Sequence, residues 1–170
     1  MKPRLLLVLL FFGGAAALLA MPAAAQDDAS DAADGFRLSD VKWQRRVLVL
    51  FAPSADDAAY RQQLRLFRTA PDSAFAERDL MLLDVPAGGS PRRRTWETKD
   101  AARDLSDEAS ERLRKRFDVP AGSFALVLVG KDGTEKRRDE APVPPEVIFA
   151  EIDAMPMRQR EMQQQSDGGR

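Results

Sequence analysis

An uninterrupted apolar run, Val47-Leu48-Val49-Leu50-Phe51, constrains the fold of this chain more than any other feature of its sequence. The run has the length of a strand and lies between Arg45-Arg46 and Ala52-Pro53. A strand without apolar–polar alternation is typical of the centre of a sheet that helices cover on both faces. The run therefore predicts an α/β domain built around a central strand.

Strand and helix patterns alternate along the rest of the chain. Further strands are predicted at 80–83, at 124–129 and, as a polar edge strand after a tight turn, at 134–138. Helices are predicted from a capping box at Ser54 to Pro71, at 106–117, and from Pro145 to Pro156. This order predicts a single α/β domain with a mixed four-stranded sheet and flanking helices, as in thioredoxin-like proteins.

Two segments outside these elements also have an expected conformation. The stretch 86–96 contains Ala-Gly-Gly-Ser-Pro followed by three arginines, and this composition predicts a flexible loop. Trp43 precedes the central strand, and we expect its ring to pack against the start of the sheet rather than to bind a ligand.

The first 25 residues have the three parts of a secretory signal peptide: a basic start, an apolar run over 5–20, and the small residues Ala23-Ala24-Ala25. The apolar run is shorter than the roughly 20 residues of a spanning helix. We therefore expect cleavage after Ala25 rather than an uncleaved anchor, a periplasmic or secreted location, and no membrane span in the mature chain. Residues 26–35 would form a disordered leader, 36–162 the domain, and 163–170 a flexible tail.

Cysteine and histidine are both missing from the sequence. Their absence excludes disulfides, thiol redox chemistry, Ser-His-Asp and Cys-His catalysis, and zinc sites of the Cys/His kind. We expect no cofactor and no metal site. Once Lys2 and Arg4 leave with the signal peptide, the 26 basic side chains fall to 24 against 27 acidic ones, a balance that does not favour nucleic-acid binding.

Three stretches of the sequence resemble a known family. They are Trp43-Gln44-Arg45-Arg46 with the strand that follows, the hairpin segment 127–133, and the string IDAMPMRQREM at 152–162. Together they resemble the domain-of-unknown-function 4174 (DUF4174, or P-DUDES) family over about 36–162. The resemblance implies a thioredoxin-like fold distantly akin to peroxiredoxins, an extracytoplasmic location, and no established reaction. Thioredoxins hold their redox cysteines at the start of the first helix after the first long strand, where this chain has no Cys.

Basic residues and methionines gather in two places, the hairpin at 131–138 and the string at 152–162. The candidate binding residues are Lys131, Lys136, Arg137, Arg138, Met157, Arg158 and Arg160. Cations on an edge strand can bind an acidic partner, or they can simply prevent edge-to-edge pairing of sheets. Methionines suit adaptable contacts but also cover sheet edges. If the string at 152–162 folds back on itself, Arg158 is expected to form an ion pair with Asp153.

Three functions are compatible with these residues. The leading hypothesis is a non-catalytic binding or scaffold module of the cell envelope that holds an envelope protein or an anionic polymer. The alternative is a carboxylate-dependent enzyme, such as a hydrolase, that uses Asp56 or Asp57; the same acids are also typical of a helix start, where they favour the helix dipole. The third is a structural domain that only stabilises a partner protein.

Overall fold

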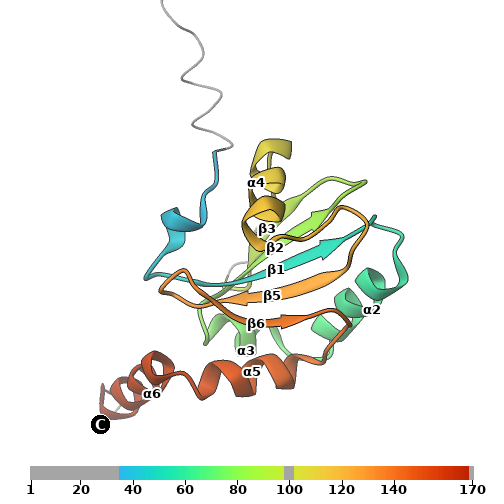
Figure 1. The fold of residues 1–170 in the computed structure, drawn as a ribbon. Coiled ribbons are helices and arrows are strands. Elements are labelled where there is room, and N and C mark those ends of the chain that lie inside the picture. The colour runs from blue at the N-terminus through green and yellow to red at the C-terminus, as the bar shows by residue number, and fades with distance from the viewer. Residues whose placement is uncertain (1–34, 98–101, 169–170) are drawn as a thin grey trace, which may run out of the picture.

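The apolar run 47–51 forms the centre of a six-stranded sheet in the computed structural model, which describes residues 35–97 and 102–168 (Figure 1). The sheet order is β4-β3-β2-β1-β5-β6. The elements, in chain order, are η1 (Leu38–Val41), β1 (Arg46–Ala52), α2 (Ala58–Phe67), α3 (Asp72–Ala76), β2 (Leu80–Pro86), β3 (Arg92–Thr95), β4 (Arg103–Asp104), α4 (Asp107–Phe117), β5 (Ala125–Val129), β6 (Glu135–Asp139), α5 (Pro145–Asp153) and α6 (Pro156–Gly168).

Strand β1 lies inside the sheet, where it makes both a parallel and an antiparallel pair. It runs parallel to β2 and antiparallel to β5, and β6 pairs antiparallel with β5. All seven residues of β1 are buried, and so are all five of β5. The prediction of a central strand within a mixed sheet is therefore confirmed.

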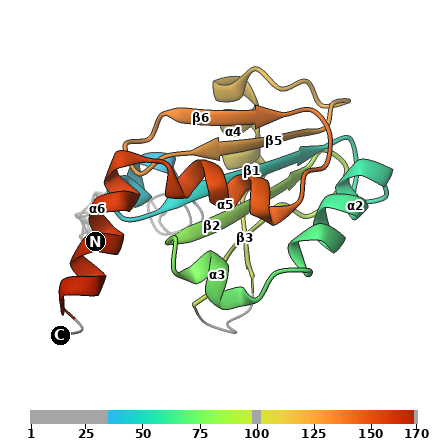
Figure 2. The same ribbon diagram turned by 90° about the horizontal axis from the view of Figure 1, so that it is seen from below.

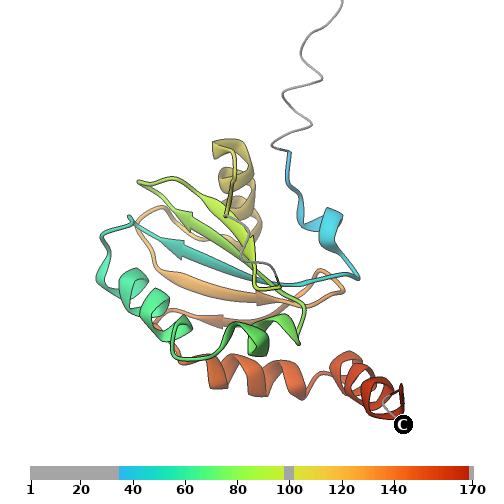
Figure 3. The ribbon, with the colours of Figure 1, turned by 180° about the vertical axis from the view of Figure 1, so that it is seen from behind.

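Helices cover both faces of the sheet (Figures 2 and 3). Val47, Val49 and Phe51 of β1 face α4 and pack with Leu113 and Phe117 of that helix. The alternate side chains of β1 face the layer formed by α2, α3 and α5, whose apolar residues include Tyr60, Phe67, Phe75, Ile148 and Ile152. Because successive side chains of a strand point to opposite faces, the single apolar run of β1 contributes to the apolar core on each side of the sheet.

The sheet has six strands rather than the four predicted from the sequence. Strands β3 and β4 form at and just after the stretch predicted to be a flexible loop, and β3 pairs antiparallel with β2. Its arginines suit a strand because their guanidinium groups lie over aromatic rings: Arg93 over Phe36 at 5.2 Å and Arg94 over Trp96 at 4.8 Å. Trp96 lies only two residues after Arg94, but the contact between Arg93 and Phe36 could not be predicted from local sequence.

The start of α2 also differs from the prediction. The N-cap is Asp57, not Ser54, and its carboxylate accepts a hydrogen bond from the backbone N–H of Tyr60 at 2.9 Å. Ser54 instead lies in the turn that precedes the cap, where its carbonyl accepts from the N–H of Asp57. Helix α4 begins as predicted, with Ser106 as its N-cap.

The two ends of the described chain hold further differences. Trp43 does not pack against the sheet: it is 60% exposed and has a left-handed backbone with φ of 67°. Helix α6 continues to Gly168, through most of the segment predicted to be a flexible tail. The predicted signal peptide and all of the leader except Gly35 lie outside the described residues. No helix in the described part of the chain is long and apolar enough to cross a membrane.

We predict that Asp57→Ala lowers the free energy of unfolding by about 1 kcal/mol, because the N–H of Tyr60 loses its capping acceptor. Asp57→Asn should retain most of that energy, since an amide oxygen also caps helices. Asp56→Ala is the matched control, because the Asp56 side chain is 97% exposed. Urea unfolding of the three variants checks the prediction, and an equal loss for Asp56→Ala and Asp57→Ala would contradict it.

Candidate functional site

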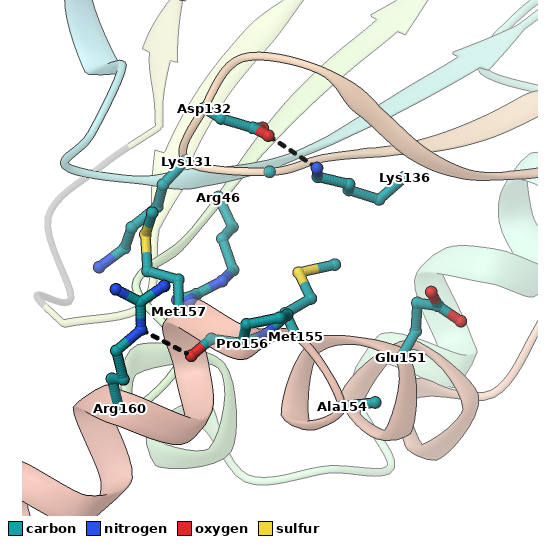
Figure 4. A pocket seen from close by; sticks show the side chains of 11 residues that line it. Arg46, Lys131, Asp132, Lys136, Glu151, Ala154, Met155, Pro156, Met157 and Arg160 are labelled. Atoms are coloured by element: carbon teal, nitrogen blue, oxygen red, sulfur yellow. Dashed lines mark hydrogen bonds and ion pairs between the residues drawn. The ribbon is translucent and has the colours of Figure 1, made fainter.

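A pocket of about 470 Å³ lies between the β5–β6 turn and the junction of α5 with α6 (Figure 4). Its wall is contributed by β1, the hairpin and the two C-terminal helices. The lining residues are Arg46, Gly130, Lys131, Asp132, Lys136, Glu151, Ala154, Met155, Pro156, Met157 and Arg160. The volume is within the roughly 300–1,000 Å³ of typical ligand sites.

The hairpin turn positions Lys136 on one side of the pocket. The register of β5 and β6 shifts next to Val129, an irregularity that re-aims side chains at the end of a hairpin. The ammonium group of Lys136 then donates to a carboxylate oxygen of Asp132 at 2.7 Å. Its chain lies across Gly130, where an added Cβ would come within 2.6 Å of the Lys136 Cε. Gly130 is therefore required for this placement of Lys136.

The other side of the pocket is the bend between α5 and α6. Helix α5 ends at Asp153 and α6 begins at Pro156, a residue that the first turn of a helix tolerates. Met155, in the bend, packs against the core layer of α2, α3 and α5. The Arg160 side chain turns back, and its Nε donates to the carbonyl of Pro156 at 3.2 Å.

A buried ion cluster attaches α6 to the sheet behind the pocket. Arg46 is only 1% exposed, and its guanidinium donates two hydrogen bonds of 3.1 Å to the two carboxylate oxygens of Glu161. Lys131 donates to Glu161 at 2.8 Å and to Asp79 at 2.7 Å. Burial raises the pKa of the Glu161 carboxyl, but the hydrogen bonds from Arg46 and Lys131 outweigh burial and hold it below its ordinary value.

Arg158 belongs to this cluster rather than to the surface. It is 4% exposed, its Nε lies 3.4 Å from a carboxylate oxygen of Asp153, and its Nη1 lies 3.7 Å from Glu161. Arg78 holds the same Asp153 with contacts of 2.5 and 3.0 Å. The expected contact between Arg158 and Asp153 is therefore present, and its burial removes Arg158 from the surface that a partner could reach.

The structure brings together four of the seven candidate binding residues: Lys131, Lys136, Met157 and Arg160 line the same pocket. The guanidinium of Arg137 is paired with Asp139 at 2.6 Å, and neither Arg137 nor Arg138 lines it. Arg138 donates to Glu135 and to the carbonyl of Phe117, on the opposite face of the sheet.

Arg46, Glu151 and Glu161 are not among the site residues predicted from the sequence. A charged residue directly before the buried run 47–51 was the available signal for Arg46, because a guanidinium at the start of a buried strand requires an anion nearby. Glu161 lies within the string 152–162, but nothing in that string indicates which strand it contacts.

Positive charge exceeds negative charge in the pocket, with four basic and two acidic lining side chains. The carboxylates of the ion cluster neutralise the positive charges of Arg46 and Lys131, and Asp132 partly neutralises the charge of Lys136. Arg160 is exposed and has no carboxylate within 4 Å among the described residues. The cations that an incoming anion can reach are therefore Lys136 and Arg160.

The carboxylates near the start of α2 have other roles. Asp57 caps the helix and Asp56 lies in solvent, 3.9 Å from Arg61. The buried acid of this region is Asp84, which accepts a hydrogen bond of 2.8 Å from the Tyr60 hydroxyl while its other oxygen has no partner. Burial raises the pKa of Asp84. Within 35–97 and 102–168, no group of acidic side chains could hold a metal ion.

The mixed sheet with helices on both faces, and a helix directly after the central strand, define a thioredoxin-like domain. Two solved peroxiredoxins share this fold. The reduced 2-Cys peroxiredoxin of Plasmodium vivax has a TM-score of 0.50 at 17% identity, with 72% of this chain and 84% of that chain covered. Thioredoxin peroxidase I of Plasmodium yoelii has a TM-score of 0.51 at 20% identity, with 72% and 79% covered. At these identities the likeness concerns the fold alone.

The chain belongs to the family described as "Domain of unknown function (DUF4174)", whose model matches residues 37–161. The resemblance noted in the sequence is thereby confirmed. Similar proteins include the sushi repeat-containing protein SRPX of Rattus norvegicus, 30% identical over 74% of this chain, and coiled-coil domain-containing protein 80 of Danio rerio, 29% identical over 78%. The chain spans only 26% and 16% of the length of these two relatives.

We predict that Glu161→Gln lowers the free energy of unfolding at neutral pH by about 3 kcal/mol, because Arg46 and Lys131 lose the carboxylate they share. The pKa of Glu161 lies below its unfolded value, so its contribution is complete above the unfolded pKa near 4.5 and is lost as the pH falls through the lower folded pKa. The difference between wild type and Glu161→Gln should therefore shrink in acid.

Urea unfolding at neutral and acidic pH measures this difference. Glu151→Gln is the matched control, because Glu151 lines the pocket without joining the ion cluster. A loss of stability for Glu161→Gln that does not change with pH, or an equal loss for Glu151→Gln, would contradict the role given to Glu161.

Proposed function

We propose that this chain is an exported, non-catalytic binding module of the cell envelope, and that the pocket between the β5–β6 hairpin and helix α6 holds an anionic partner. One observation carries the proposal: Lys131 and Lys136 of the hairpin and Met157 and Arg160 of α6, which belong to two separate segments, line one pocket. If the cations of β6 served only to prevent edge-to-edge pairing of sheets, there would be no reason for a second cationic segment to face them.

The electrostatics of the pocket support a reversible, salt-dependent contact. Asp132 and the lack of a side chain at Gly130 hold Lys136 in place, so that little further ordering is needed when an anion binds. Arg160 offers a guanidinium, whose donors suit carboxylates. Exposed ion pairs contribute about 0.2–1 kcal/mol each and are screened by salt, so a partner must combine several of them.

The carboxylate-dependent alternative has less support than the binding proposal. An enzyme of this kind needs two acids whose pKa values are pushed apart. Asp57 is engaged as a helix cap and Asp56 lies in solvent. The buried acid of the same region, Asp84, has a tyrosine hydroxyl as its partner rather than a second carboxylate.

We predict that the double variant Lys136→Gln/Arg160→Gln binds a fluorescently labelled oligoglutamate peptide roughly tenfold more weakly than wild type in low-salt buffer, because both accessible cations of the pocket are lost. Arg137→Gln/Arg138→Gln is the matched control, since it removes the same charge from side chains outside the pocket. Fluorescence anisotropy measures both affinities. Equal weakening by the two double variants would indicate only a diffuse positive edge and would overturn the proposed site.

Export is a separate part of the proposal and rests on the pattern of residues 1–25. We predict that the protein recovered from the periplasm or medium of an expressing bacterium begins at Gln26, because signal peptidase requires small residues such as Ala23 and Ala25 before the cleaved bond. Intact-mass measurement identifies the new N-terminus. A full-length chain found only in the membrane fraction would favour an uncleaved anchor instead.

A further inference from the structure

We infer that the ligand of the hairpin–α6 pocket is an acidic peptide segment that carries an apolar anchor side chain between its carboxylates, and not a uniform polyanion. This inference rests on the proposed function, because it specifies the partner of the same pocket. Three features of the lining support it: an apolar stretch at the α5–α6 bend, two accessible cations near this stretch, and an acidic residue beside it.

The side of the pocket formed by the α5–α6 bend is apolar. Ala154, Met155, Pro156 and Met157 form a continuous stretch of the lining at the bend between α5 and α6. Met155 and Met157 are both partly buried, and flexible thioether side chains adapt to apolar groups of different shape. A polyphosphate or an acidic polysaccharide has no aliphatic side chain to place on this surface, whereas a leucine or methionine of a peptide would remove apolar area from water.

The two accessible cations near this apolar stretch come from different segments of the chain. Lys136 comes from the hairpin and Arg160 from α6, and in the view of Figure 4 Lys136 lies above the Met155 side chain while Arg160 lies to its left. A ligand that places an apolar group on the methionines therefore meets cations from two different segments. An extended peptide with acidic residues before and after the anchor matches this arrangement of charges.

The lining also contains a carboxylate close to the apolar stretch. Glu151 lines the pocket beside the apolar stretch and forms no ion pair within the described residues. A polymer with an anionic group on every unit would place one of them near this carboxylate, at a cost from like-charge repulsion. A peptide avoids the cost, because it can present a backbone N–H or a neutral side chain at that position.

The test compares two labelled peptides of equal charge, one with a central leucine flanked by glutamates and the other with serine in place of the leucine. Both are titrated with the full mature chain by fluorescence anisotropy, and inorganic polyphosphate serves as an unlabelled competitor. We expect the leucine peptide to bind roughly tenfold more tightly than the serine peptide, since it buries an apolar side chain.

Met157→Ser should abolish most of this difference while leaving the affinity for the serine peptide unchanged. Met162→Ser is the matched control, because Met162 belongs to the same helix but does not line the pocket. Circular dichroism of both variants establishes that the helices are intact, so that a loss of binding can be assigned to the lost contact.

The outcomes separate this inference from the proposed function. Preference for the leucine peptide that depends on Met157 supports the inference. If both peptides bind equally, or polyphosphate binds more tightly than either, while Lys136→Gln/Arg160→Gln weakens them all, the pocket binds anions but the inference is wrong. If none of the three probes binds, the proposed function and the inference both fail.

Discussion

The guanidinium of Arg46 is buried at the start of the central strand, and its positive charge must be neutralised there. The C-terminal part of the domain supplies the carboxylate that does so. A guanidinium keeps its charge in proteins, so its burial requires an anion with matching geometry. Glu161 supplies that anion from 115 residues further along the chain and shares it with Lys131. Such a buried pair adds little net stability compared with apolar packing, but breaking it is costly. The main effect of this ion pair is therefore on the position of α6, which it holds against the start of β1.

The pocket is a consequence of this placement. Once Glu161 attaches α6 to the sheet, the bend between α5 and α6 faces the β5–β6 turn, and the methionines of the bend face the lysines of the turn. The same contact removes Arg158 and most of Lys131 from solvent, because both extend toward shared carboxylates behind the pocket. Lys136 and Arg160 remain accessible. The domain architecture thus depends directly on one carboxylate, Glu161, and the proposed anion binding would depend on it indirectly, through the position of α6.

The candidate site lies at the opposite end of β1 from the position that thioredoxins use for redox chemistry. That position follows Ala52, at the start of α2, and here it holds a capping aspartate and no cysteine. The pocket is lined by Arg46, the first residue of the same strand. Six residue steps of about 3.3 Å separate the two ends, or about 20 Å. A thioredoxin-like fold can therefore keep its sheet while a different edge of the domain carries the contacts with a partner.

The sequence alone determined the elements whose signals are local: the buried strand at 47–51, the helix capped by Ser106, the hairpin turn with Gly133 at φ of 78°, and the apolar face of α5. Each of these depends on residues a few positions apart, through backbone hydrogen bonds and side-chain periodicity. Only the tertiary structure decided that the arginines after Pro91 form a strand, because that strand depends on pairing with β2, and because Phe36, the ring beside Arg93, lies far away in the sequence. It also decided which candidate cations face the pocket. The cations of one segment carry the same charge, so the sequence does not distinguish them. Long-range contacts determine which of them is buried, paired or accessible.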